Sequence, residues 1–148
     1  MRPSSLEHLG LAPALKSYCA DFARKEGIGV RFLARDLPRT VPQEIALNLY
    51  RVVQEALSNV AKHSGARRAL VSLSAREGSL RLVVKDTGRG FDPALARSRG
   101  LGLINMDERV RSLGGSFSLQ AQPGHGVHID VRVPVRKGNR RAPQKRSQ

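Results

Sequence analysis

The feature that most constrains this chain is an apolar stripe at helical spacing between residues 45 and 60. Its members are Ile45, Leu49, Val52, Val53, Ala56 and Val60. Recurrence at three and four residues predicts one long helix with a core-facing side. Thr40-Val41-Pro42-Gln43 resembles a capping box, and Gly65 is a suitable C-terminal stop. We therefore expect this helix to run from about Thr40 to Gly65.

A second face of the same helix is polar. Arg51, Glu55 and Asn59 follow one another at a spacing of four, and then come Lys62 and His63. Four residues advance an α-helix by slightly more than one turn, so these side chains would lie nearly in line. A carboxylate, an amide oxygen and a cation along one ridge suit a hard metal ion and the phosphates that it bridges. For the helix taken alone, an ordinary solvated face explains the pattern at least as well.

Composition limits the fold and the setting of the protein. The 148 residues fit one domain, and its core must be aliphatic because the sequence has no Trp and only six Phe and Tyr residues. Cys19 is the single cysteine, which excludes an internal disulfide and a cysteine-based zinc site. No apolar run is long enough for a membrane span, and no signal peptide opens the sequence. These features predict that the chain is cytoplasmic. They are equally compatible with its being the cytoplasmic part of a membrane-bound protein.

The formal net charge of +14 is unevenly spread. Residues 136–148 contain six Lys and Arg residues and no acid, which predicts a disordered basic tail. Without the tail the charge is +8. Such a body suits a polyphosphate ligand about as well as nucleic acid. A module that binds nucleic acid or an acidic membrane through the tail is one alternative, but aromatic side chains are absent there. We expect no nucleic-acid partner.

The pattern along the chain predicts an α+β domain over residues 11–135. Hairpin-joined strands favour helices on one face of a mostly antiparallel sheet, a two-layer sandwich. Residues 1–10 are expected to be the remnant of a linker from an upstream segment, and residues 87–99 a mobile loop. The predicted elements are helices near 11–25, 40–65 and 101–113 and strands near 30–34, 69–75, 80–86, 116–121 and 127–133.

Asp86 is in phase with the apolar residues Leu80, Leu82 and Val84 of its strand. A carboxylate on the buried face of a strand is costly unless a partner satisfies it. Gly88 and Gly90 follow directly, and glycines permit close approach of a ligand to the backbone. This arrangement suits a hydrogen bond from an amino group on a flat ring, although an Asp-Thr-Gly turn alone is a weak signal.

Two further glycines stand where the next helix begins, in Gly100-Leu101-Gly102-Leu103. A helix N-terminus that is open in this way presents free N–H groups to phosphate oxygens. By itself this motif is also compatible with a flexible turn. The fixed order of polar-ridged helix, Asp-x-Gly-x-Gly-Phe, loop and Gly-Leu-Gly-Leu is far more specific.

In these motifs the sequence resembles the ATP-binding catalytic domain of bacterial sensor histidine kinases, in the nitrate-sensor-like and desaturase-sensor-like branch. That branch belongs to the gyrase, chaperone, kinase and mismatch-repair ATPase superfamily. The resemblance covers residues 6–135. It rests on the segments 49–63, 86–91, 100–103 and 106–115, the last of which contains Met106-Asp107-Glu108-Arg109-Val110.

The resemblance implies a role for each matching position. Asn59 would coordinate Mg²⁺ on the ATP phosphates with help from Glu55, and Lys62 and His63 would lie near those phosphates. Asp86 would accept from the adenine amino group. The base pocket and phosphate site would be completed by Gly88, Gly90, Phe91, Gly100, Leu101, Gly102 and Leu103. The implied cofactors are ATP and Mg²⁺, and the implied partners are a helical phosphoacceptor and dimerisation hairpin and a response regulator.

Two departures from the family pattern affect these expectations. Val127 follows Gly126 where the family usually has Thr, which removes a hydroxyl from the base pocket. The four histidines, His8, His63, His125 and His128, lack the acidic neighbour of a phosphoacceptor. We therefore expect the acceptor histidine to lie on another chain segment and this chain alone to be monomeric. A stand-alone serine kinase of the anti-sigma type is the second alternative, which the kinase-like linker at residues 1–11 disfavours.

The basic tail generates a first prediction. After Val135 the only apolar residue is Ala142, so nothing anchors the tail in a core. Deleting residues 137–148 should leave both the melting temperature and the ATP affinity nearly unchanged. Thermal denaturation and calorimetric ATP titration of the two chains would check this, and a large drop in either quantity would contradict it.

Overall fold

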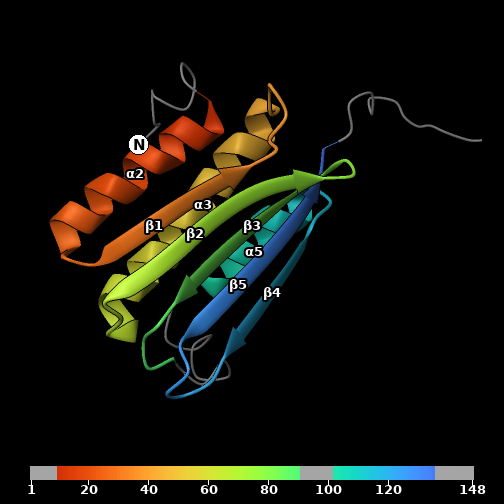
Figure 1. Cartoon of the computed structure of the whole chain (residues 1–148). Coiled ribbons are helices and arrows are strands. Elements are labelled where there is room, and N and C mark those ends of the chain that lie inside the picture. The colour runs from red at the N-terminus through yellow and green to blue at the C-terminus, as the bar shows by residue number, and fades with distance from the viewer. Residues whose placement is uncertain (1–9, 91–101, 136–148) are drawn as a thin grey trace, which may run out of the picture.

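One sheet of five strands carries all the described helices on a single side (Figure 1). We analysed a computed structural model, which describes residues 10–90 and 102–135. Its elements are α2 (Leu11–Glu26), β1 (Gly29–Arg35), α3 (Gln43–Asn59), the π-helical turn η1 (Val60–Ser64), β2 (Arg68–Arg76), β3 (Ser79–Asp86), α5 (Leu103–Ser112), β4 (Ser116–Ala121) and β5 (Val127–Pro134). The predicted two-layer α+β architecture is confirmed.

The strands lie in the order β1-β2-β3-β5-β4. The pairs β2–β3, β3–β5 and β4–β5 are antiparallel, whereas β1 and β2 are parallel because α3 crosses between them. The hairpin between β2 and β3 turns at Glu77 and Gly78, which both have positive φ angles, of 51° and 79°. Such angles match the twist of the paired strands. The pairs β2–β3 and β4–β5 are each joined by a short turn, which makes them antiparallel.

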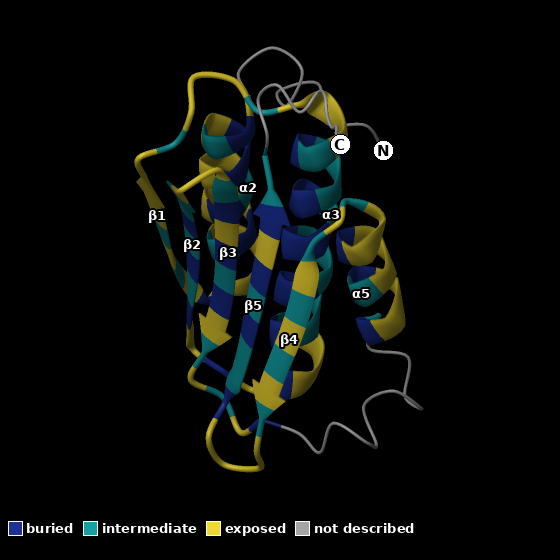
Figure 2. Ribbon diagram, turned by 90° about the vertical axis from the view of Figure 1, so that its right-hand side faces the viewer, coloured by how far each residue is buried: buried dark blue, intermediate teal, exposed yellow. Residues whose placement is uncertain are grey.

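The core lies between α3 and the sheet. Leu49, Val52, Val53 and Leu57 of α3 are completely buried, as expected for most of the apolar stripe. Buried and exposed residues alternate along the strands opposite (Figure 2), and the inward set includes the fully buried residues Val71, Leu73, Leu82, Val131 and Val133. Among residues 10–90 and 102–135, no helix combines the length and apolar character needed to cross a membrane.

The ends of the long helix differ from the sequence-based expectation. The capping box is wrong, because α3 begins at Gln43 with Pro42 as its N-cap and no capping side chain. Pro42 has φ −51° and ψ 140°, an extended conformation, so Thr40 stands too far ahead of the first turn to cap it. The last turn, η1, is π-helical, and it ends as predicted at Gly65, which is left-handed with φ 69°.

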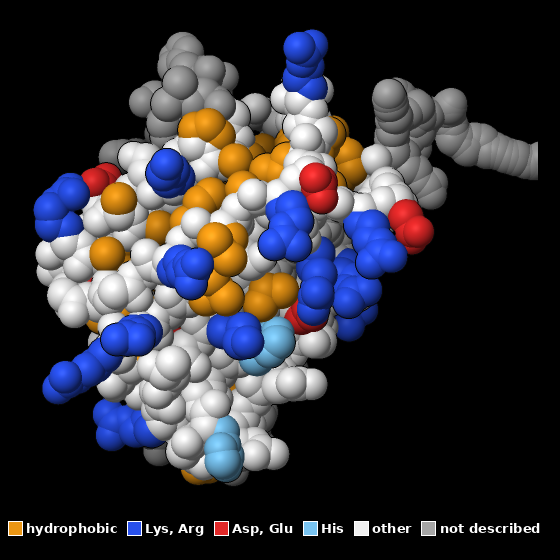
Figure 3. Space-filling view, in the orientation of Figure 1, with side chains coloured by type: hydrophobic (Ala, Val, Ile, Leu, Met, Phe, Trp, Pro, Cys, Tyr) orange, Lys and Arg blue, Asp and Glu red, His pale blue; other side chains and the backbone are white. Residues whose placement is uncertain are grey.

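The outer face of the sheet is open and basic in the described part of the chain. Figure 3 looks onto this face and shows apolar side chains surrounded by Lys and Arg. Alternation along β1, β3 and β5 directs five exposed cations outward, and they are Arg31, Arg35, Arg81, Lys85 and Arg132. On these three strands the only acid in the same phase is Asp130.

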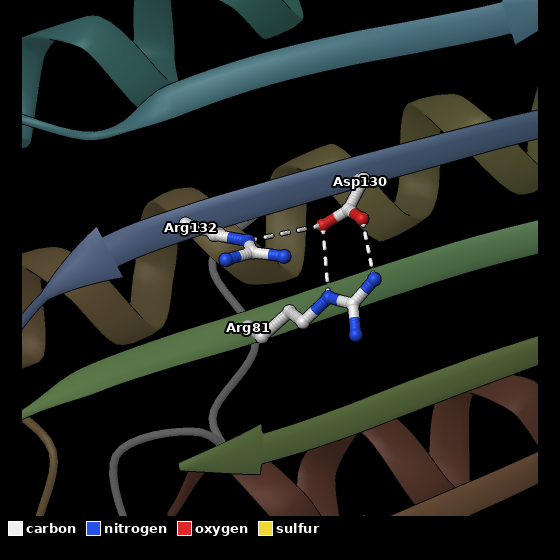
Figure 4. Close-up of polar contacts among 3 residues, drawn as sticks. All are labelled: Arg81, Asp130 and Arg132. Atoms are coloured by element: carbon white, nitrogen blue, oxygen red, sulfur yellow. Dashed lines mark hydrogen bonds and ion pairs between the residues drawn. The ribbon is translucent and has the colours of Figure 1, made fainter. Parts of the chain in front are cut away.

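Asp130 joins two arginines across neighbouring strands (Figure 4). Both Arg81 Nε and Nη2 donate to its carboxylate, at 3.1 and 2.6 Å, and Arg132 Nε lies 3.8 Å away. The hydrogen bonds from Arg81 lower the pKa of Asp130 below its ordinary value. Because the Arg81 side chain is 46% exposed, water screens the pair and its contribution to stability is modest.

Asp130→Asn should reduce the free energy of unfolding at pH 7 by about 0.2–1 kcal/mol. A carboxyl group with a lowered folded-state pKa stabilises the fold above its unfolded-state pKa. That contribution is lost as the pH falls through the folded-state value. Denaturant titration at pH 7 and at pH 3 or below would therefore show the difference between variant and parent shrinking at acid pH. Asp21→Asn, in the more exposed pair with Arg24, is the matched control and should cost less. A difference that stays constant with pH would contradict this assignment.

Candidate functional site

A narrow cleft lies where the C-terminal half of α3 meets the ends of β3, β4 and β5. Its walls are mostly apolar and come from six elements, α3, η1, β3, α5, β4 and β5. The lining residues are Ala56, Asn59, Val60, Ser64, Val84, Asp86, Leu103, Leu119, Val127 and Ile129. A mostly apolar cleft with a few polar groups is the usual form of a small-molecule site. Three predicted site residues, Asn59, Asp86 and Leu103, are thus brought together.

Asp86 is the carboxylate of this cleft. It is partly buried, in phase with the apolar residues of β3 as predicted. Its Oδ1 atom accepts from the Gly88 backbone N–H at 2.8 Å, and the Val127 N–H also donates to the carboxylate. Burial raises the pKa of Asp86, and these two N–H groups oppose the rise. A carboxylate has about four acceptor positions, so capacity remains for a ligand donor.

Gly88 allows the segment after β3 to lie directly on the end of η1. A Cβ atom at Gly88 would stand only 2.8 Å from Ser64 Cβ and Oγ and would overlap the Ser64 carbonyl. The Arg89 N–H donates to that carbonyl at 2.9 Å, which holds the two segments together. Gly88 therefore positions Asp86 through close backbone packing, and its predicted place in a base pocket stays a prediction.

Gly90 makes a similarly close backbone contact, with the turn between β4 and β5. It has φ 68°, and a Cβ there would be 2.9 Å from the Gly126 carbonyl oxygen and would overlap that of Gln122. The Gly124 N–H donates to the Arg89 carbonyl oxygen. The turn between β4 and β5 is thereby held against the end of β3. This contact explains the requirement for glycine, while direct contact of Gly90 with a ligand stays a prediction.

Glu55 and Asn59 follow the cleft wall along α3. Gly102, with φ 72°, begins α5 next to Glu55, since a Cβ at Gly102 would lie 2.7 Å from Glu55 Cγ. A polar groove of about 400 Å³ continues from Glu55 between α3 and α5, and it is lined by Arg51, Gln54, Glu55, Asn105, Met106 and Arg109. The structure thus places the polar ridge of α3 beside the N-terminus of α5.

Lys62 and His63 lie beyond the point where the ridge geometry applies. Both are in η1 and both side chains are exposed. A π-helical turn has more residues per turn than an α-helix, so positions after Asn59 no longer align at a spacing of four. The straight ridge therefore extends from Arg51 to Asn59 only. The proximity of Lys62 and His63 to the ATP phosphates stays a prediction.

Some predicted residues lie outside the described part of the chain. These are Phe91, Gly100 and Leu101, most of the expected loop 87–99, the linker remnant 1–10 except Gly10, and the basic tail 136–148.

Sequence reasoning missed Ser64 and Arg109 as parts of the site. Ser64 is 2% exposed, and its hydroxyl donates to the Val60 carbonyl and accepts from the Ala66 N–H, both at 3.0 Å. It is the small residue against which Gly88 packs. The position of Ser64 directly before Gly65, the predicted end of the helix, could have indicated its role. Arg109 could have been found because it belongs to the family motif at residues 106–110.

The sequence profile described as "Histidine kinase-, DNA gyrase B-, and HSP90-like ATPase" matches residues 44–137, which include the cleft, both glycine motifs and the polar groove. This chain belongs to that family. The match confirms the ATP-binding domain and its α/β sandwich, while assignment to the nitrate-sensor-like branch stays a prediction.

Curated relatives of this ATPase domain are sensor kinases. It is 34% identical to the histidine-protein kinase/phosphatase DegS of Brevibacillus brevis and 35% identical to the sensor histidine kinase LiaS of Bacillus subtilis, in each case over 91% of this chain. It is 40% identical to the sensor histidine kinase MctS of Rhizobium johnstonii over 90% of this chain. The alignments span 35%, 37% and 30% of these three proteins, so the chain covers about a third of their length.

Solved structures agree on the fold of the ATPase domain. The histidine kinase domain of the blue-light activated kinase of Erythrobacter litoralis EL346 superposes with a TM-score of 0.68 and 24% identity, over 84% of this chain and 61% of that one. The ATP-binding domain of PrrB from Mycobacterium tuberculosis gives 0.66 and 22%, over 85% and 94%. The second match covers nearly the whole PrrB domain, which fits a single folded domain.

Asp86→Asn should weaken ATP binding while leaving the fold intact. The expected loss is about 1.5–3 kcal/mol, the scale of a hydrogen bond to a charged group, or roughly 10–150-fold in affinity. Burial raises the pKa of Asp86, so this carboxylate takes up a proton at a higher pH than an ordinary aspartate does. As the pH is lowered, the ATP affinity of the parent should therefore begin to fall at a correspondingly higher pH.

The matched control is Asp130→Asn, the same chemical change on the outer face of the sheet. It should leave ATP affinity unaltered. Calorimetric titration and a melting curve of each variant test both statements. If a folded Asp86→Asn chain binds ATP as the parent does, Asp86 is not the base-binding residue.

Proposed function

We propose that this chain binds ATP with Mg²⁺ and that, in an intact sensor kinase, it presents the γ-phosphate to a histidine on a separate helical hairpin. The observation that carries the proposal is the position of Asp86. It stands in a mostly apolar cleft whose opposite wall, α3, brings the oxygen donor Asn59. Glu55, four residues earlier on α3, lines the adjoining polar groove. One end of this site suits an adenine ring and the other suits a charged polyphosphate.

The base end of the site offers apolar walls and one carboxylate. Val84, Leu119, Val127 and Ile129 provide surface for a flat ring, and Asp86 provides an acceptor for its exocyclic amino group. The absence of a Thr hydroxyl at Val127 removes only a side-chain contact. The Val127 backbone N–H still donates to Asp86 and orients it.

The polyphosphate end offers few protein ligands for a metal. Within residues 10–90 and 102–135, no cluster of three or more His, Cys, Asp and Glu side chains is placed to hold an ion. Glu55 and Asn59 add one carboxylate and one amide oxygen. Mg²⁺ commonly keeps several waters and binds through one or two protein oxygens together with substrate phosphates. The donor set therefore fits Mg²⁺ that arrives with ATP, where it would neutralise phosphate charge.

Transfer itself would depend on positioning. Phosphoryl transfer requires an acceptor atom close to the γ-phosphate and in line with the leaving oxygen. Gly102 opens the N-terminus of α5 beside Glu55, so backbone N–H groups of α5 would hold phosphate oxygens there. In the proposed scheme a response regulator then takes the phosphate from the hairpin histidine. The domain boundaries proposed for this unit are residues 11 and 135.

Asn59→Ala should remove more of the Mg²⁺ dependence of ATP binding than of adenosine binding. The amide oxygen is proposed to contact the metal, whereas the base is proposed to contact Asp86, on the β3 side of the cleft. Measuring ATP and adenosine affinities with and without Mg²⁺ separates the two effects. Asn105→Ala, an exposed amide on α5 that borders the neighbouring groove, is the control. An unchanged effect of Mg²⁺ in Asn59→Ala would mean that the ridge is an ordinary polar helix face.

The chain alone should bind ATP without phosphorylating itself on histidine. His63 is exposed on a helical turn, His125 lies between β4 and β5, and His128 lies on β5. None has an acidic residue after it. Incubation with γ-labelled ATP, followed by an assay for acid-labile, base-stable phosphate, should give no stoichiometric label. Supplying the hairpin in trans should restore weak transfer.

Two results would overturn parts of this proposal. Stoichiometric acid-labile label on the isolated chain would make one of its own histidines the acceptor. Acid-stable label on a serine of a partner would favour the anti-sigma type of serine kinase instead.

A further inference from the structure

Charge is distributed unequally between the two layers of the domain. The helical elements α2, α3, η1 and α5 carry seven Lys and Arg residues and six Asp and Glu residues, which nearly balance. The outer face of β1, β3 and β5 carries five cations and the single acid Asp130. The open side of the sheet, and not the domain as a whole, therefore holds a concentrated positive charge. The ATP site lies on the helical side and does not use it.

The cations of this outer face surround an apolar centre. Pairing places Leu33, Ser72, Val83 and Asp130 in one row across the sheet. The row on one side contains Arg35, Arg81 and Arg132, and the row on the other contains Arg31, Leu70, Lys85 and His128. Leu33 is 40% exposed, and among the large apolar residues of 10–90 and 102–135 only Ile104 is exposed as well. Figure 3 shows the same arrangement of orange side chains among blue ones.

A shallow groove of about 560 Å³ opens at one end of this face. Its floor is largely backbone and apolar side chain, including Gly29, Val30, Ala69 and Leu70. Three cations border it, and they are Arg31, Arg68 and Lys85. Thr87 and Asp86, the last residue of β3 and in the inward phase of that strand, also line its end. Gly29 has no side chain on the outward position between them, which leaves the hollow. Convergence of three cations on an apolar groove suits a phosphate group that is attached to an apolar body.

The shape and composition of the face favour a lipid surface over nucleic acid. The outward positions of the five strands contain no Phe, Tyr or Trp, since Phe32 and Phe117 lie in the inward phase. Base stacking is therefore not available there. A broad sheet face also cannot enter a DNA groove, which admits a helix or a two-stranded ribbon. An anionic bilayer is itself broad, carries phosphate throughout, and accepts exposed apolar side chains beside cations.

We propose that the outer face of the sheet binds the surface of an anionic membrane. Arg31, Arg68 and Lys85 contact lipid phosphate at the groove over Gly29. Arg35, Arg81 and Arg132 add long-range attraction, with Asp130 orienting the two arginines beside it. Leu33 and Val83 lie between the cations and contact the interface. The proposed ATP cleft opens on the helical side of the sheet, and Asp86 at the end of β3 is the one described residue that lines both the cleft and this groove.

The test uses the full 148-residue chain and sedimentation with vesicles of phosphatidylcholine, with or without phosphatidylserine. Binding is expected only to the vesicles with phosphatidylserine and should fall steeply as salt is raised, since the charges are exposed. The double variant Arg31→Glu, Arg35→Glu brings the formal charge of the outward positions of β1, β3 and β5 from +4 to zero and leaves Arg68 and Arg76 of β2 unchanged. Each Lys or Arg near such a surface contributes about fivefold, so binding should weaken at least about tenfold.

The matched control is Lys16→Glu, Lys25→Glu on α2, which changes the net charge of the protein equally. It should retain most of the vesicle binding, as should the chain without residues 137–148. Melting temperature and ATP affinity establish that each variant is folded. The proposal is overturned by any of three results. These are no binding to phosphatidylserine vesicles, equal weakening by the control, or loss of binding on removal of the tail alone. Face-dependent binding of DNA or of an acidic protein, without vesicle binding, would also overturn it.

Discussion

The burial of one face of α3 against the sheet is the constraint on which the rest of the structure depends. Leu49, Val53 and Leu57 are fully buried there, and the burial of such side chains is worth about 1.5–3 kcal/mol each. The same contact fixes the rotation of α3 about its axis. Asn59 is thereby directed into the cleft at the end of β3 and Glu55 into the adjoining groove, so the packing of the core and the geometry of the proposed nucleotide site are set together.

The polar part of the site is maintained by close backbone contacts. Burying a carboxylate is costly, and the N–H groups of Gly88 and Val127 compensate Asp86 for part of that cost. The contact between Gly88 and Ser64 holds those donors in place. A side chain at Gly88 would separate the end of β3 from the end of η1. Gly88 therefore serves the orientation of the carboxylate, while a role of these glycines in ligand access stays a prediction.

The two faces of the sheet carry different chemistry because a strand directs successive side chains to opposite sides. In β3, Leu82 and Val84 enter the core, whereas Arg81 and Lys85 are exposed on the open side. One strand thus contributes both to the ATP-binding side and to the basic face. The five cations of the outer face are therefore not among the residues that line the cleft.

Much of this protein was determined by the sequence alone. Apolar periods of 3.6 and 2 specified the helices and strands, since burial follows those periods directly, and the phase of Asp86 with Leu82 and Val84 placed it on the cleft side. The family was readable because its motifs stand in fixed order. The sequence did not reveal the extended Pro42 N-cap or the π-helical turn, because local hydrogen-bonding alternatives differ little in energy and packing decides between them. The approach of Ser64 to Gly88, the groove beside Arg109 and the row of cations across β1, β3 and β5 required strand order and register. Those depend on contacts between residues far apart in the chain, which only the tertiary structure supplies.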